Sequence, residues 1–277
     1  MKFSAIFLIA LLCACSSTGE AIKIKGSDTE VNLAVVMAEQ FHKVNKDVLV
    51  SISGGGSGLG IASLLNGNAN IANSSRSIKP SELELFKNKS IELDSFVFAQ
   101  DAIAFVVSDK ISIDSISVTD VAKILSGEYI NWTSINQFNK PITIYGRQSN
   151  SGTHDYVKEI LKIHFSPYAK QMNGNAQIIE ALKADDSGIG YISAGYVLKS
   201  NTSGLKILSI YTPQFNSVSP LDANAIASGM YYFQRPLFQY YRRKEFIKIK
   251  PFLDFEQSEI GATIIKESGY YPYNLVK

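Results

Sequence analysis

A polar stretch at residues 147–155, R-Q-S-N-S-G-T-H-D, combines one fixed cation with several small hydrogen-bond donors. Arg147 supplies a guanidinium that stays charged at any physiological pH. Ser151, Gly152 and Thr153 then lead into a segment of helical character. Because the start of a helix carries unpaired N–H groups and the positive end of the helix dipole, this stretch could bind an anion. A capped polar turn is the alternative, since the same residue types are common there.

Three other loops have the same design, in which a predicted strand ends in small polar residues and a helix follows. They are Gly26-Ser27-Asp28-Thr29, Ser53-Gly54-Gly55-Gly56-Ser57-Gly58 and Asn73-Ser74-Ser75-Arg76. Helix capping explains any one of them better than a ligand does. Four such loops in one chain favour a shared anion site.

Motifs for other chemistries fit the glycine-rich loop poorly. Leu59 and Ile61 stand where G-x-G-x-x-G needs its last glycine, and no G-K-S/T follows, so neither nucleotide motif is present. Ser57 lacks the second glycine of G-x-S-x-G, which argues against a hydrolase nucleophile. The three histidines are scattered and no cluster has metal-ligand spacing, so we expect neither a metal nor a cofactor.

The elements that position these loops alternate between strands and helices. Periodicity predicts strands at 21–25, 48–52, 70–72, 96–107, 142–145, 189–192 and 205–210. It predicts helices at 31–43, 58–65, 81–87, 118–125, 153–163 and 177–183. This order indicates an α/β protein with mainly parallel sheets, in which ligand loops gather at the carboxyl ends of the strands.

Composition is that of an ordinary globular protein. The 277 residues are 45% hydrophobic and 19% charged, which allows one large or two modest domains. The formal charge of +2 supplies no field that would recruit nucleic acid. The most basic tract, residues 242–250, is predicted to be a solvated helix face.

The N-terminus has the form of a bacterial lipoprotein signal peptide at residues 1–14. A charged start precedes an apolar run that is too short for a stable membrane anchor. Leu12-Cys13-Ala14-Cys15 resembles a lipobox with Cys15 as the lipidated residue, and 15–20 would be a tether. A plain secretory signal is the alternative. We expect a lipid-anchored protein on the extracytoplasmic (periplasmic or outer) side of the cell membrane, without a disulfide.

The four loops together resemble those of the phosphate-binding proteins of Pst-type ABC transporters. Further segments agree, namely L-S-G-E-Y-I-N-W-T-S-I-N at 125–136, G-I-G-Y at 188–191 and Q-R-P-L at 234–237. The resemblance covers nearly all of residues 21–277. Its most specific motif is R-x-x-x-S-G-T at 147–153.

The resemblance implies a type II periplasmic-binding-protein fold, in which two α/β lobes are joined by two crossover strands and the ligand lies in the cleft. The first crossover is expected near Asp101 and the second near 225–230. Lobe 1 would comprise residues 21–101 and 230–277, and lobe 2 would comprise residues 102–229.

The function implied is capture of inorganic phosphate and its delivery to the transmembrane permease subunits of an ABC transporter. We expect a monomer without catalytic activity. The phosphate-binding residues, carried over by position, are Asp28, Thr29, Ser57, Gly58, Ser75, Arg76, Arg147, Ser151, Gly152 and Thr153.

Two departures from the family pattern concern carboxylates. Many members carry an aspartate in the third loop, where this chain has Ser75, and another two residues after the arginine, where it has Ser149. Asp28 stands instead where many members have a hydroxyl. We hypothesise that Asp28 accepts the phosphate proton, repels sulfate and pairs with Arg147 across the cleft. Simple capping of the following helix is the alternative.

Other functions remain open at this stage. The same loops could hold another tetrahedral oxyanion, such as sulfate or molybdate, although Asp28 argues against it. A phosphoester hydrolase is less favoured, because a metal cluster and an evident nucleophile–base pair are missing from the sequence. A surface adhesin or sensor could use the same scaffold without transport.

Overall fold

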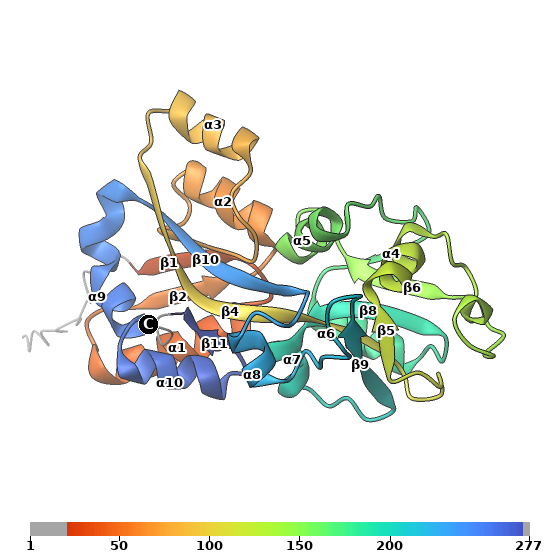
Figure 1. The fold of residues 1–277 in the computed structure, drawn as a ribbon. Coiled ribbons are helices and arrows are strands. Elements are labelled where there is room, and N and C mark those ends of the chain that lie inside the picture. The colour runs from red at the N-terminus through yellow and green to blue at the C-terminus, as the bar shows by residue number, and fades with distance from the viewer. Residues whose placement is uncertain (1–20, 274–277) are drawn as a thin grey trace, which may run out of the picture.

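The computed structural model describes residues 21–273, which form two α/β lobes (Figure 1). One mixed sheet of eleven strands runs through both lobes, with the order β2-β1-β3-β10-β4-β8-β6-β7 along its main path. Away from that path, β11 and β9 pair with β4, and β5 pairs with β9. The predicted α/β class with two lobes is confirmed.

Lobe 1 contains the N-terminal strands and helices together with the C-terminal segment. Its elements are β1 (Ile22–Gly26), α1 (Val31–Val44), β2 (Val50–Ser53), α2 (Ser57–Leu65), β3 (Ile71–Ser74), α3 (Pro80–Asn88), β10 (Gln234–Arg242), η2 (Arg243–Glu245), α9 (Phe246–Glu256), α10 (Glu259–Glu267) and β11 (Tyr271–Pro272). β1 pairs in parallel with β2 and β3, whereas β10 is antiparallel to β3. The sequence patterns predicted the N-terminal elements and a solvated helix face at 242–250, where the structure has η2 and the start of α9, but they assigned no element to 231–241 or 251–273.

Lobe 2 contains the middle of the chain. Its elements are β5 (Ser115–Ser117), α4 (Val118–Ser126), η1 (Trp132–Ser134), β6 (Thr143–Arg147), α5 (Gly152–Leu161), β7 (Lys170–Met172), α6 (Asn175–Lys183), β8 (Gly188–Ser193), α7 (Ala194–Leu198), β9 (Leu205–Tyr211) and α8 (Ala223–Ala227). β6 pairs in parallel with β7 and β8. The sequence did not predict the short strands β5 and β7 or the short helices α7 and α8.

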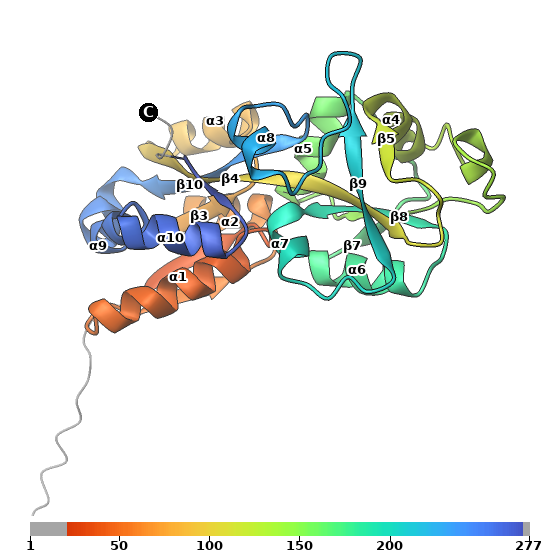
Figure 2. The same cartoon turned by 60° about the horizontal axis from the view of Figure 1, so that its bottom comes forward.

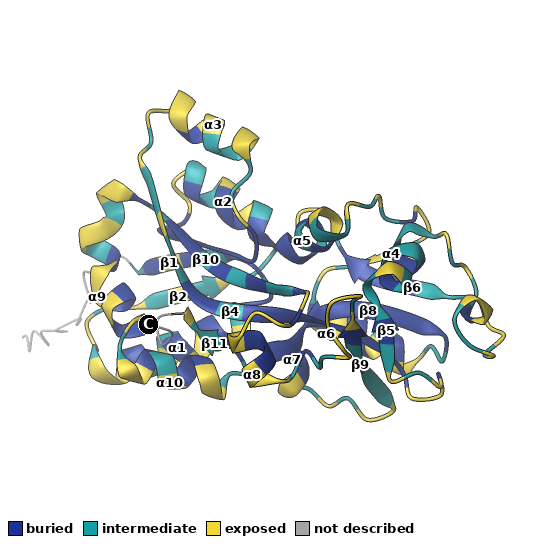
Figure 3. Ribbon diagram, in the orientation of Figure 1, coloured by how far each residue is buried: buried dark blue, intermediate teal, exposed yellow. Residues whose placement is uncertain are grey.

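Each lobe has its own apolar core, as the dark inner sheet and the exposed outer helix faces in Figure 3 show. In β1, Ile22 and Ile24 are buried while Lys23 between them is exposed, which is the two-residue period of a strand. In lobe 2, Trp132 is completely buried and its indole N–H donates to the carbonyl of Ser187 at 2.8 Å. The buried indole thus keeps a hydrogen-bond partner.

The strand β4 (Leu93–Ser108) passes from one lobe into the other. Its first part, through Ala102, pairs with β10 of lobe 1, and the remainder pairs with β8 and β9 of lobe 2. The chain returns through β10, which begins at Gln234. Tyr231 and Phe233 still pack in the lobe 2 core, so the second limit would lie nearer Gln234 than the predicted 230. The exact lobe limits stay a prediction.

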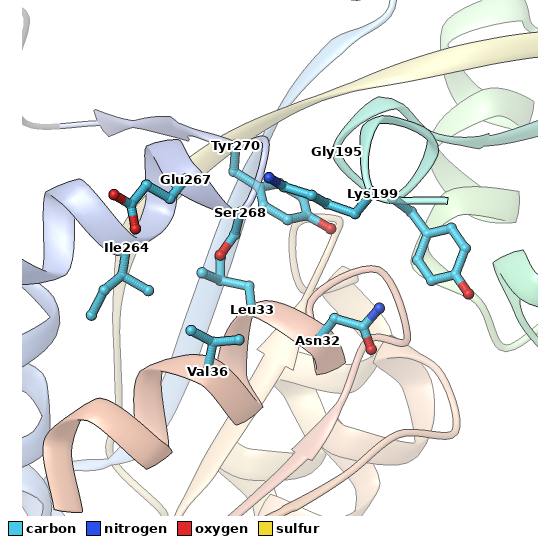
Figure 4. A pocket seen from close by; sticks show the side chains of 10 residues that line it. Asn32, Leu33, Val36, Gly195, Lys199, Ile264, Glu267, Ser268 and Tyr270 are labelled. Carbon is cyan, nitrogen blue, oxygen red and sulfur yellow. The ribbon is translucent and has the colours of Figure 1, made fainter. Parts of the chain in front are cut away.

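Helices α1 and α10 lie along the same face of lobe 1, next to α7 of lobe 2 (Figure 2). Between these three helices is a groove of about 320 Å³ (Figure 4). Its lining includes Leu33, Val36, Lys199, Ile264 and Tyr270. None of its lining residues belongs to the four polar loops.

The predicted signal peptide, the tether and Cys15 lie outside the described residues. Within residues 21–273, no helix is both long enough and apolar enough to cross a membrane.

Candidate functional site

The four polar loops predicted from the sequence meet where the two lobes face each other. Ser27 Oγ donates to Ser75 Oγ at 3.0 Å, and Ser57 Oγ lies 3.4 Å from Ser75 Oγ. Across the lobes, Thr29 Oγ1 lies 3.2 Å from Thr153 Oγ1. All five of these residues are buried. We call these five side chains the hydroxyl cluster.

Helix starts surround the hydroxyl cluster. Ser57 is the first residue of α2, and Gly152 is the first residue of α5. Ser151 caps α5, because its Oγ accepts a hydrogen bond from the backbone N–H of Thr153 at 3.2 Å. Gly152 lies so close to lobe 1 that a Cβ there would be 2.3 Å from Ser57 Oγ. The positive ends of two helices, one from each lobe, therefore point at the same small region.

The loop before α2 needs its glycines for this approach. Gly56 has φ of 93°, a conformation that side chains other than glycine rarely adopt. A Cβ at Gly56 would also lie 2.9 Å from the carbonyl oxygen of Asn150 in the opposite lobe. The G-G-G run therefore lets the two backbones come together.

Arg147 lies at the end of β6 and pairs with Asp28 of the other lobe. Arg147 Nη2 is 2.6 Å from Asp28 Oδ2, and the arginine is only 1% exposed. Asp28 Oδ1 also accepts a hydrogen bond from the backbone N–H of Gly55 at 2.8 Å. The predicted pairing of Asp28 with Arg147 across the cleft is confirmed. The N-cap of α1 is Glu30, so the alternative in which Asp28 caps that helix is not supported.

The remaining contacts of Arg147 leave it short of acceptors. Its Nη2 also donates to the carbonyl of Asn173 at 3.0 Å, and its Nη1 donates to Asn175 Oδ1 at a long 3.4 Å. Its buried Nε has no hydrogen-bond partner among residues 21–273. Burial lowers the pKa of Arg147, and nearby Arg235 acts in the same direction, while Asp28 opposes them. An anion at the hydroxyl cluster would supply the missing acceptors.

Arg235 is the residue that sequence reasoning missed. It is 2% exposed, and its Nη2 donates to Thr29 Oγ1 at 3.1 Å and to Asp101 Oδ2 at 2.9 Å. Its Nη1 reaches the carbonyl oxygen of Ser75 at 3.3 Å. The Q-R-P-L motif marked this position by resemblance, but nothing in the sequence gave it a role. Arg235 therefore holds two of the lobe 1 loops at the start of β10.

The charges around the hydroxyl cluster balance. Arg147 and Arg235 face the carboxylates of Asp28 and Asp101. Burial raises the pKa of Asp101, and the charge of Arg235 opposes that effect. Burial also raises the pKa of Glu30 well above its usual value. Any ligand must therefore be held mainly by directed hydrogen bonds, because the surroundings have no large net charge.

Arg76 and Gly58 were predicted to bind the ligand, and the structure places both in other contacts. Arg76 donates through Nη1 and Nη2 to the two carboxylate oxygens of Glu82, at 2.8 and 2.7 Å. Its Nε lies 2.9 Å from Asp155 Oδ2 in lobe 2. The backbone N–H of Gly58 donates to the carbonyl of Asn150 at 3.0 Å. Both residues connect the lobes at the edge of the hydroxyl cluster: Nη1 and Nη2 of Arg76 already donate to Glu82, and the N–H of Gly58 already donates to Asn150.

The arrangement of these groups suits the binding of a tetrahedral oxyanion better than it suits catalysis. It places hydroxyls, helix starts and a buried arginine on neighbouring loops of the two lobes, and groups of this kind hold dehydrated anions. Among the described residues, no group of His, Cys, Asp and Glu could hold a metal ion.

Comparison with known proteins agrees with this geometry. The profile of the PBP superfamily domain matches residues 14–259. The chain is 31% identical over 268 residues to the phosphate-binding protein PstS of Borreliella burgdorferi, covering 93% of this chain and 92% of that protein. It is 28% identical over 258 residues to the protein SphX of Synechococcus elongatus, covering 89% of this chain and 76% of that protein.

Solved structures show the same architecture. A protein from Clostridium perfringens, solved with bound phosphate, matches with a TM-score of 0.82 at 23% identity, covering 92% of this chain and 100% of that chain. PstS from Borrelia burgdorferi matches with a TM-score of 0.59 at 31% identity, covering 92% and 99%. The expected type II periplasmic-binding-protein fold is confirmed. The chain therefore belongs to the PBP superfamily and, within it, to the family of the PstS phosphate-binding proteins.

Proposed function

We propose that this chain captures inorganic phosphate outside the cytoplasmic membrane and delivers it to the permease of an ABC transporter. The observation that carries the proposal is the meeting of four polar loops, from both lobes, around buried Arg147. Relatives named phosphate-binding protein PstS, at up to 31% identity over most of the chain, support the same ligand.

Phosphate would bind at the hydroxyl cluster, between the starts of α2 and α5. The proposed donors are the hydroxyls of Thr29, Ser57, Ser75, Ser151 and Thr153, the backbone N–H of Gly152 and the guanidinium of Arg147. Asp28 would accept the proton that HPO₄²⁻ carries and sulfate lacks. A carboxylate at that place repels a fully ionised anion, so it would select phosphate over sulfate.

The proposed role in transport extends beyond the binding site. We propose that Cys15 carries the lipid anchor and that the protein works as a monomer on the extracytoplasmic side, without catalysis. Permease subunits of an ABC transporter would be its protein partners. The charge balance around the site agrees with binding through hydrogen bonds, which would let the anion leave once the lobes separate.

Isothermal titration of ligand-stripped protein with phosphate and with sulfate tests the function. We expect one phosphate per chain and much weaker binding of sulfate. Thr153→Val should weaken phosphate binding roughly three- to tenfold, because it removes one buried donor.

Ser203→Ala, in an exposed loop of lobe 2, is the matched control and should leave the affinity unchanged. Equal or tighter binding of sulfate would favour the alternative of a different tetrahedral oxyanion. Absence of binding by both anions would overturn the proposal.

A further inference from the structure

A second group of charged side chains bridges the two lobes beside the hydroxyl cluster. Asp155, in α5 of lobe 2, lies 2.9 Å from Arg76 Nε and 2.6 Å from Lys79 Nζ, both in lobe 1. Figure 1 shows α5 at the edge of lobe 2 that faces α2 and α3. The three residues form a bridge between segments that are separated in the sequence by more than seventy positions.

The lobe 1 half of this bridge is held in place within its own lobe. Glu82 binds the guanidinium of Arg76 through both carboxylate oxygens, and its Oε2 also accepts the backbone N–H of Lys79 at the start of α3. Arg76 Nη1 additionally donates to the carbonyl of Ser77 at 2.9 Å. The Arg76 guanidinium is therefore fixed before the lobes meet, so little of its side-chain entropy is lost when Asp155 arrives.

The lobe 2 half is a carboxylate that stays ionised. Burial alone would raise the pKa of Asp155, but His154, Lys79 and Arg76 together hold it below its usual range. The side chain of Asp155 is 10% exposed and that of Arg76 is 4% exposed. Because water is largely excluded from the Arg76 contact, this bridge is stronger than a pair on the open surface.

This bridge is separate from the proposed phosphate ligands. Arg76 Nη1 and Nη2 donate to Glu82 and Ser77, its Nε lies 2.9 Å from Asp155 Oδ2, and none of these contacts is with a member of the hydroxyl cluster. The bridge can form only when the lobes are in contact, since Asp155 and its two cations come from opposite lobes. Any free energy that it contributes therefore favours the closed arrangement alone.

We propose that Asp155 is an interlobe latch, which pairs with Arg76 and Lys79 to stabilise the closed lobes and slow the release of the bound anion. This inference rests on the proposed phosphate-binding function. Asp155 is a positioning residue in this role, because it acts on the ligand through the lobes and does not touch it. The latch sets the residence time of phosphate, whereas the hydroxyl cluster sets its identity.

The test compares Asp155→Asn with the wild-type chain. The variant should bind phosphate roughly tenfold more weakly, with most of the change in the dissociation rate measured by chase of radiolabelled phosphate. The ratio of phosphate to sulfate affinity should not change, because no ligand contact is removed. Small-angle X-ray scattering without ligand should show a larger radius of gyration for the variant than for the wild type.

Two further variants protect the test against a folding defect. Asp186→Asn removes a carboxylate that pairs with Lys110 inside lobe 2, so it should leave the phosphate dissociation rate unchanged. Lys79→Ala removes the more exposed cation, at 38% exposure, and should speed dissociation less than Asp155→Asn does. Melting temperatures of all variants identify any loss of folding.

Tighter phosphate binding by Asp155→Asn would overturn the latch, since it would mean that freed Arg76 is itself a ligand. An unchanged dissociation rate together with unchanged scattering would overturn it as well. Failure of the wild type to bind phosphate would instead contradict the proposed function. In that case the scattering comparison still decides whether Asp155 holds the lobes together.

Discussion

Two ion-pair groups cross between the lobes, and their surroundings differ. Asp28 and Arg147 lie beside buried hydroxyls and helix starts, whereas Asp155, Arg76 and Lys79 lie next to another charged side chain, that of Glu82. Both groups join the same lobes over a short distance. The difference in their neighbours indicates that only the first group can exchange a protein partner for an anion.

The pKa values of Arg76 and Arg147 also differ between the two groups. Burial would lower the pKa of Arg76, but its contacts with Glu82 and Asp155 raise it above its usual value. Burial and the charge of Arg235 lower the pKa of Arg147, and Asp28 compensates only in part. Arg76 is thus paired with two carboxylates, whereas Arg147 is paired with one and would gain from another negative charge.

The largest loss of phosphate affinity is expected when Arg147, the cation of the first group, is removed. Arg147→Ala should weaken phosphate binding on the order of 1,000-fold, because Asp28 would then face the anion without compensation. Isothermal titration measures this loss. Arg243→Ala, which removes an exposed arginine paired with Glu92 and Asp94, should leave the affinity unchanged. A similar loss for Arg243→Ala would mean that overall charge, and not the site, attracts phosphate.

Removing the carboxylate of Asp28 should reduce phosphate affinity less than removing Arg147 does, but it should also change the preference for phosphate over sulfate. Asp28→Asn should weaken phosphate binding roughly 10- to 100-fold and strengthen sulfate binding, because it removes the acceptor and the repulsion together. Competition between the two anions in the calorimeter measures both changes. Unchanged phosphate affinity without a gain for sulfate would show that Asp28 only pairs with Arg147.

Glu256 is a buried carboxyl outside both ion-pair groups, and it should affect the stability of the fold without affecting phosphate binding. Burial raises the pKa of Glu256 to about 8 against an ordinary value of 4.5, and the hydrogen bond from Gln239 opposes this only in part. The folded state therefore keeps the proton that the unfolded chain releases, and the free energy of unfolding falls as pH rises from 4.5 to about 8. Between about pH 5 and about pH 7 this loss is on the order of 2 kcal/mol.

Glu256→Gln should remove that loss, so its melting temperature should exceed that of the wild type near neutral pH and approach it in acid. Differential scanning calorimetry across this pH range measures the difference, with Glu267→Gln at the surface as the control. Phosphate affinity should not change, because Glu256 belongs to neither ion-pair group. A pH profile identical to that of the wild type would contradict the raised pKa.

Much of the candidate site was predictable because its signals are local. Ser151, Gly152 and Thr153 were recognisable as a helix start, and each polar loop followed a strand with an evident pattern. The missing aspartate at Ser149 even pointed to the contact of Asp28 with Arg147, which the structure confirms. The role of Arg235 was not predictable, because its partners Thr29 and Asp101 are more than 130 positions away.

The sequence by itself determined most strands and helices of residues 22–211, though not β5, β7, η1 or α7, together with the α/β class and the polar loops at strand ends. These follow from periodicity, glycine conformation and helix capping, which act over a few residues. Only the tertiary structure decided that Arg76 pairs with Asp155 and Glu82, and that Gly58 bonds to Asn150. An arginine in a polar loop can turn to any nearby acceptor, and which acceptor is nearest depends on how the lobes pack.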